Sequence, residues 1–213
     1  MSPATERLKV HRRSVDLGGH RHTALSPRPG DSAVVAGDPR PGTPSVVTDV
    51  AGAHLVGRLC WAMAYQRHER TLVVIEGRLG ASDPSEADPS SAVVIVNSDL
   101  GSVTSDTAAA LAAVLPFATP SDGTVVLQTR GLDVALGDPA AFRAREDQAE
   151  WRDRHDRQGG IGVREGLVVI EAPAAVLCAW GVALTGVVDA DPSGDGSELV
   201  DLPGATGEVR VVR

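Results

Sequence analysis

Polar side chains follow three segments rich in Val, Ile and Leu, at the point where each segment ends. Asp99 follows SAVVIVNS, Arg130 follows TVVLQT, and Glu171 comes at the end of GLVVIE. Ligands of open α/β sheets bind beyond the carboxyl ends of parallel strands. Two carboxylates with an arginine between them can hold Mg²⁺ and a phosphate group. The structural alternative is that strands end at the surface, where polar residues are common, and that Glu171 simply pairs with Arg130.

The loop NSDLGSVTSDT at 97–107 is the second candidate site. It leaves an apolar segment and enters a predicted helix through Gly101, Ser102 and Thr104. Backbone amides at a helix N-terminus attract anions. The loop has no Lys for a GxxxxGK[ST] motif and only one glycine for GxGxxG. Capping alone also explains Ser and Thr at this place. We retain Ser102 and Thr104 as candidate ligand-binding residues, together with Asp99, Arg130 and Glu171.

A helix predicted from Asp49 to about His68 carries the secondary candidates. His54, Arg58 and Tyr65 fall on one stripe of it, which is suited either to anion binding and acid–base chemistry or to an ordinary amphipathic face. Elsewhere, His20 and His22 would share one face of a strand. Two ligands do not make a metal site, and neither CxxC nor HExxH is present, so no metal site is predicted.

The elements that position these residues form an α/β pattern. The segments 71–79 and 91–99 are joined by GASDPSEADPS, which has no helical period. Because a parallel crossover needs about ten or more residues, usually helical, we predict an antiparallel pair here, which puts Glu76 at the opposite edge from Asp99. Strands at 92–98, 124–130 and 166–172 then alternate with helices at about 105–115, 139–157 and 174–184. That alternation is typical of parallel βαβ units.

We therefore predict a mixed, mostly parallel sheet with helices on both faces, an antiparallel strand pair near 71–98 and a loosely structured N-terminal strand or hairpin region. Residues 1–48 form a basic, Pro/Gly-rich segment packed on or beside a single α/β domain at 49–213. Within that segment, the apolar residues of 33–35 and 46–47 flank DPRPGTP, which indicates a strand or hairpin. A hydrophobic content of 42% is enough for a core without disulfides or metal.

Composition narrows the class of protein and its location. A net charge of −8 and an aromatic content of 3% argue against nucleic-acid binding. The longest apolar run, 167–188, contains Glu171 and Pro173, so it indicates a strand and a buried helix rather than a membrane span. Residues 1–25 lack an apolar signal-peptide core, and Cys60 and Cys178 sit in apolar runs, so a cytoplasmic location is predicted. Arg makes up nineteen of the 20 basic residues, a bias typical of high-GC bacterial genomes.

Two functional hypotheses remain. The preferred one is a non-catalytic cytoplasmic binding or accessory protein, with a protein partner or a homo-oligomer, because covalent-catalysis motifs are missing and the charge-dense helix 142–158 and the oppositely charged chain ends suit assembly. The alternative is a phosphate- or nucleotide-ligand enzyme or binder at the strand-end cluster. No cofactor is predicted, except Mg²⁺ under this alternative.

Overall fold

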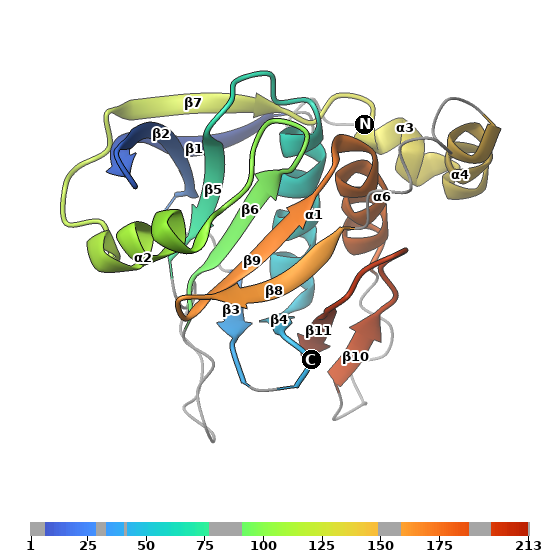
Figure 1. The fold of residues 1–213 in the computed structure, drawn as a ribbon. Coiled ribbons are helices and arrows are strands. Elements are labelled where there is room, and N and C mark those ends of the chain that lie inside the picture. The colour runs from blue at the N-terminus through green and yellow to red at the C-terminus, as the bar shows by residue number, and fades with distance from the viewer. Residues whose placement is uncertain are drawn as a thin grey trace.

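The computed structural model describes residues 7–28, 33–40, 42–76, 91–148, 159–187 and 197–212. They form a seven-stranded sheet in the order β7-β1-β2-β5-β6-β9-β8 and a four-stranded sheet in the order β10-β11-β4-β3 (Figure 1). The strands of the large sheet are β1 (Arg7–Leu17), β2 (His20–Pro27), β5 (Thr71–Ile75), β6 (Val93–Asn97), β7 (Gly123–Gln128), β8 (Gly160–Arg164) and β9 (Leu167–Ala172). Those of the small sheet are β3 (Val35–Asp38), β4 (Ser45–Thr48), β10 (Ser197–Val200) and β11 (Glu208–Val212).

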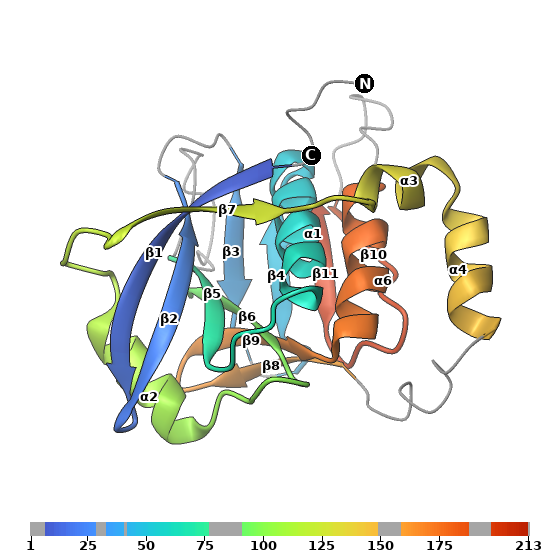
Figure 2. The same ribbon diagram turned by 90° about the horizontal axis from the view of Figure 1, so that it is seen from above.

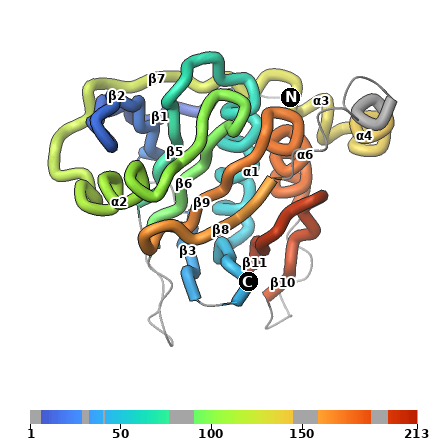
Figure 3. Tube along the Cα trace, viewed as in Figure 1, coloured from blue at the N-terminus to red at the C-terminus, as the bar shows by residue number. Residues whose placement is uncertain are grey.

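Helices cover both faces of the large sheet, as predicted. They are α1 (Val50–Ala64), α2 (Ser105–Val114), α3 (Leu132–Gly137), α4 (Pro139–Gln148) and α6 (Ala174–Thr185). One core cluster joins residues of α1 and α6 to one face of the sheet, and a second joins α2 to the other face. Helices α1 and α6 run beside each other, as the trace in Figure 3 and the view in Figure 2 both show. The apolar run at 167–188 is confirmed as a strand, β9, and a buried helix, α6.

The predicted antiparallel pair is confirmed, because β5 and β6 pair in antiparallel fashion with Val73 opposite Ile95. The expectation of a mostly parallel sheet is wrong. Only the β2–β5 and β6–β9 ladders of the large sheet are parallel, and the other four are antiparallel. Strand β7 does not join β6 and β9 but lies at the far edge beside β1. Its residues alternate between half-buried and exposed, as in an edge strand with one solvated face.

The pairing of β1 with β2 was not predicted from the sequence. The two strands form a long hairpin whose turn, Gly18–Gly19, has φ values of 57° and 79° at its two glycines. Both values lie in the left-handed region that glycine adopts without steric cost. Arg and His fill most of the exposed positions of this hairpin, so its apolar alternation is hard to see. The second hairpin, β3–β4, lies where the apolar residues flanking DPRPGTP indicated one.

Both cysteines are buried and free. Burial raises the pKa of the Cys60 thiol to about 12, which keeps it protonated and unreactive. Within the described ranges, no helix is long and apolar enough to cross a membrane.

An ion pair at the end of β3 makes stability depend on pH. Both carboxylate oxygens of Asp38 accept hydrogen bonds from Arg40 Nε at 2.8 Å, and this pairing lowers the pKa of Asp38. A carboxyl whose folded-state pKa is lowered stabilises the fold above its unfolded pKa, and that stability is lost as the pH falls through the folded value. Because Arg40 is largely exposed, we expect Asp38→Asn to cost only about 1 kcal/mol at pH 7.

Urea unfolding at pH 7 and near pH 2.5 checks this prediction. The difference between the wild type and Asp38→Asn should shrink as the pH falls, because protonation of Asp38 removes the ion pair with Arg40. The exposed Asp201 provides a control, because Asp201→Asn should have little effect at either pH. A difference that is the same at both pH values would contradict the assignment.

Candidate functional site

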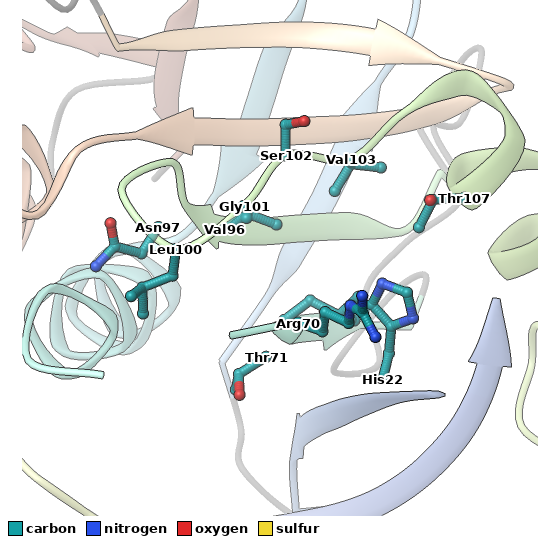
Figure 4. A pocket seen from close by; sticks show the side chains of 11 residues that line it. His22, Arg70, Thr71, Val96, Asn97, Leu100, Gly101, Ser102, Val103 and Thr107 are labelled. Atoms are coloured by element: carbon teal, nitrogen blue, oxygen red, sulfur yellow. The ribbon is translucent and has the colours of Figure 1, made fainter. Parts of the chain in front are cut away.

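A small pocket of about 40 Å³ opens at the end of the large sheet where β2 and β5 begin and β6 ends. Its lining comes from separate parts of the chain, shown in Figure 4: His22 of β2, Arg70, Thr71 and Leu72 at the start of β5, Val96 and Asn97 of β6, Leu100, Gly101, Ser102 and Val103 of the following loop, and Thr107 of α2. Strand pairing explains why these residues meet. Since β5 is antiparallel to β6, the residue before β5 lies beside the loop that follows β6.

Arg70 places a positive charge on one wall of the pocket, and His22 lies on the same wall. Strand β2 is parallel to β5, with Thr23 opposite Thr71, and the Thr23 amide donates to the Arg70 carbonyl at 3.0 Å. That bond helps to hold Arg70 at a φ of 56°, a left-handed conformation that costs on the order of 1 kcal/mol in a residue with a side chain. None of the ion pairs found among the described residues includes the guanidinium group of Arg70.

The histidine on the same wall has one ring nitrogen in a contact and the other available. His22 Nδ1 lies 2.9 Å from the carbonyl oxygen of His20, which can only accept a hydrogen bond. Nδ1 therefore carries a proton, which in the neutral ring leaves Nε2 as an acceptor.

The opposite wall is the loop that enters α2. Thr104 caps this helix, with its Oγ1 accepting from the Thr107 amide at 3.2 Å and lying 2.9 Å from Thr107 Oγ1. Gly101 has a φ of 153°, a value that glycine adopts easily because it has no side chain, and the backbone turns there. The loop and the first turn of α2 thus form the side of the pocket that lies across from Arg70. They place Thr107 and the positive end of the helix dipole there (Figure 4).

Asn97 forms the base of this arrangement and is buried. Its Nδ2 donates to the Met63 carbonyl at 3.1 Å, and its Oδ1 accepts from the Asp99 amide at 3.0 Å. The side chain therefore ties the last turn of α1 to the start of the loop. This fixes the loop relative to the sheet before any ligand binds.

The five predicted ligand-binding residues do not share one site. Ser102 lines the pocket, and Thr104 caps α2 beside it. Asp99 Oδ2 accepts from the Ala174 amide at 2.9 Å, so it lies at the N-terminus of α6. Glu171 pairs with Arg164 rather than with Arg130, and both line a separate hollow of about 410 Å³ along β8 and β9. Arg130 follows β7, and its carbonyl accepts from Trp61 Nε1 at 3.3 Å.

The secondary candidates also have separate surroundings. His54 Nε2 lies 2.7 Å from the Val187 carbonyl, and Arg58 Nη2 donates to the Arg7 carbonyl at 3.1 Å. The Tyr65 ring is exposed, with its centroid 5.6 Å from that of Trp61. The stripe on α1 therefore contacts several parts of the chain rather than one pocket. The described residues stop at Gln148, the last residue of α4, and resume at Gly159. Most of the charge-dense segment 142–158 therefore lies outside them.

Sequence reasoning missed His22, Arg70 and Thr107 as members of one site. The strand-end candidates were taken only from the carboxyl ends of the strands, because ligands of parallel sheets bind there. The predicted antiparallel pairing was itself the signal. It implies that the residue immediately before the strand at 71, which is Arg70, meets the loop that follows the strand ending near 97.

Comparison with family models, with curated proteins and with solved structures finds no match to this chain. The side chains of the described residues also form no group of three or more His, Cys, Asp and Glu that could hold a metal ion. The fold is that of a mixed α/β protein. The pocket is the feature of this fold that best suits a ligand.

Proposed function

We propose that this protein binds a small anionic ligand, carrying a phosphate or carboxylate group, in the pocket between Arg70 and the N-terminus of α2. The observation that supports the proposal most is the position of Arg70 and His22 across the pocket from that helix end (Figure 4). The proposal takes the phosphate-type ligand from the alternative hypothesis drawn from the sequence, but places it in a different site from the strand-end cluster of Asp99, Arg130 and Glu171. A cytoplasmic location belongs to the same proposal.

The chemistry of the two walls is complementary to an anion. A guanidinium group can donate two parallel hydrogen bonds to phosphate or carboxylate oxygens. Backbone amides at a helix N-terminus add donors and a favourable dipole. The described residues that line this pocket include no Asp or Glu, so nothing among them repels a negative charge.

The apolar part of the pocket lining limits the size and polarity of the rest of the ligand, beyond its charged group. Leu72, Val96, Leu100 and Val103 line the same pocket. The pocket has a volume of about 40 Å³, which is room for about three water molecules and so for a small group only. We therefore expect a small phosphorylated or carboxylated metabolite rather than a dinucleotide.

Removing the Arg70 charge should weaken anion binding. Titration calorimetry with inorganic phosphate, pyrophosphate and a small dicarboxylate should detect a binding anion for the wild type. Arg70→Gln should raise its Kd by about tenfold or more, because a hydrogen bond to a charged group contributes about 1.5 to 3 kcal/mol. Ser102→Asp, which adds a negative charge on the opposite wall, should weaken binding as well.

The matched control is Arg67→Gln. Arg67 is exposed, lies three positions earlier and does not line the pocket, so its loss changes the net charge equally without touching the site. The proposal fails if none of the anions binds the wild type. It also fails if Arg70→Gln binds as the wild type does, or if Arg67→Gln weakens binding to the same extent.

A further inference from the structure

We infer that a second surface, on β1 and β7, docks an extended acidic segment of a partner protein. Arg7, Lys9, His11 and Arg13 alternate along β1 and therefore share one face of the sheet. Arg28, just after β2, reaches the same face, where its Nη2 donates to Thr124 Oγ1 at 2.8 Å. These five residues are called the basic face below. Arg7 and Lys9 are exposed and the other three are half-buried, in a chain whose net charge is −8.

The neighbouring strand leaves this face open. The register places Arg7, Lys9 and His11 opposite Gln128, Val126 and Thr124 of β7. All three β7 residues are exposed, and Val126 keeps 42% of its surface accessible. Helix α2 packs on the same face farther along β1, near Val15 and Leu17, and Figure 1 shows it apart from β7.

The positive charges of the basic face have neutral partners. Arg13 Nη1 donates to Ser26 Oγ at 2.7 Å, and its guanidinium carbon lies 4.9 Å from the centre of the Phe117 ring. Arg28 Nε is buried and has no hydrogen-bond partner among the described residues. The ion pairs found in the described part of the chain involve Arg40, Arg164 and Arg210 instead. The basic face therefore presents ordered cations that lack a carboxylate.

Asp122 lies beside β1 but is engaged by other groups than the basic face. Asp122 Oδ2 accepts from the Ser14 amide at 2.7 Å, and this bond, with Arg12 and Arg21 nearby, lowers the pKa of Asp122. Arg12 and Ser14 alternate with the residues of the basic face, so their side chains point to the other side of the sheet.

Strand β7 supplies the means of attachment. It is an edge strand of the large sheet, so its outer backbone groups can pair with an added strand. In such a strand every second side chain would lie on the same face of the sheet as the basic face, with the same repeat of about 6.6 Å, and about 10 Å from β1, a span that long Arg, Lys and Glu side chains can bridge across β7. Alternating Glu or Asp would thus meet the charges, and the intervening side chains would lie on the other face.

An acidic peptide fits this surface better than a nucleic acid. Binding of single-stranded nucleic acid uses exposed aromatic rings on which bases stack. The Phe117 ring, which lies beside the basic face, is covered by Arg13. An exposed valine between the cations also suits the apolar part of a peptide side chain.

Fluorescence anisotropy with a labelled peptide of about ten residues that alternates Glu and Val tests the inference. We expect binding that weakens as salt rises from about 50 to 500 mM, since exposed charges are screened. The double variant Arg7→Glu/Lys9→Glu should weaken binding by about tenfold or more. Arg67→Glu/Arg143→Glu changes the net charge equally at exposed sites away from β1 and should bind as the wild type does.

Two further arms separate the alternatives. A peptide of the same composition with its Glu residues in one block should bind more weakly if strand addition is the mode. Phosphate binding in the pocket should be the same in Arg7→Glu/Lys9→Glu as in the wild type, so failure here is distinct from failure of the proposed function. Absence of peptide binding, equal loss in both double variants, equal binding of the block peptide, or tighter binding of a single-stranded oligonucleotide or an anionic vesicle would each overturn the inference.

Discussion

Replacing Gly52 with alanine should destabilise the protein by about 3 kcal/mol, although the same change usually stabilises a helix. Gly52 lies in the first turn of α1, where its amide donates to the capping oxygen Asp49 Oδ1 at 2.6 Å. A Cβ atom at this position would collide with Thr48 Oγ1 and with the Val34 carbonyl oxygen. These two groups are hydrogen-bonded to each other at 2.6 Å, so neither can move without losing that bond.

Gly137 provides the matched control for this prediction. It is also a helical glycine, at the end of α3, but nothing lies within 4 Å of the Cβ that an alanine would add. Gly137→Ala should therefore be neutral or stabilise the fold by about 0.5 kcal/mol. Urea unfolding of both variants measures the contrast. Equal effects at the two positions would show that helix propensity, rather than the close approach of α1 to the 34–48 hairpin, determines the result.

Replacing Trp180 with alanine should cost about 3 to 5 kcal/mol. Trp180 is fully buried on α6, and its Nε1 donates to the Pro203 carbonyl at 2.9 Å. It belongs to the core cluster that also contains Leu202 and Val209 beside the small sheet. The side chain therefore links α6, the large sheet and the segment between β10 and β11.

Trp180→Phe separates the contribution of the ring from that of the hydrogen bond. It keeps an aromatic side chain but loses the donor, so we expect a loss of about 1 to 3 kcal/mol, smaller than that of the alanine variant. Because one core cluster spans both sheets, thermal unfolding followed by circular dichroism and by tryptophan fluorescence should give the same midpoint in each protein. Separate midpoints, or a loss below about 1 kcal/mol in Trp180→Ala, would contradict a shared core.

The sequence predicts a basic segment at 1–48 packed on or beside a domain at 49–213. The strand order of the two sheets shows which strands this segment contributes. Strands β1 and β2 pair within the large sheet, and β3 and β4 pair within the small one. Residues 7–48 thus contribute strands to both sheets. We expect a chain that begins at Asp49 not to fold, because it lacks β2, which pairs with β5, and β4, which pairs with β11.

Local pattern was enough to find the elements that bury apolar side chains on a regular period. Helix α1, the antiparallel β5–β6 pair, the β3–β4 hairpin, and β9 followed by α6 all follow from it. Composition likewise indicated that the two cysteines are buried thiols. These features are short-range, because hydrophobic period, capping and turn residues act within about a dozen positions.

Tertiary structure alone decided where β7 pairs and which side chains share a pocket. Strand order depends on contacts between distant segments, and the β1–β2 hairpin, whose exposed positions are mostly basic or polar, occupies the place beside β7. That order separates Arg130 from Asp99 and Glu171. The same pairing rules brought Arg70 and His22, from the starts of two strands, to the loop containing Ser102 at the end of a third. The sequence by itself determined that this loop leads into a helix N-terminus; the fold supplied the arginine that faces it.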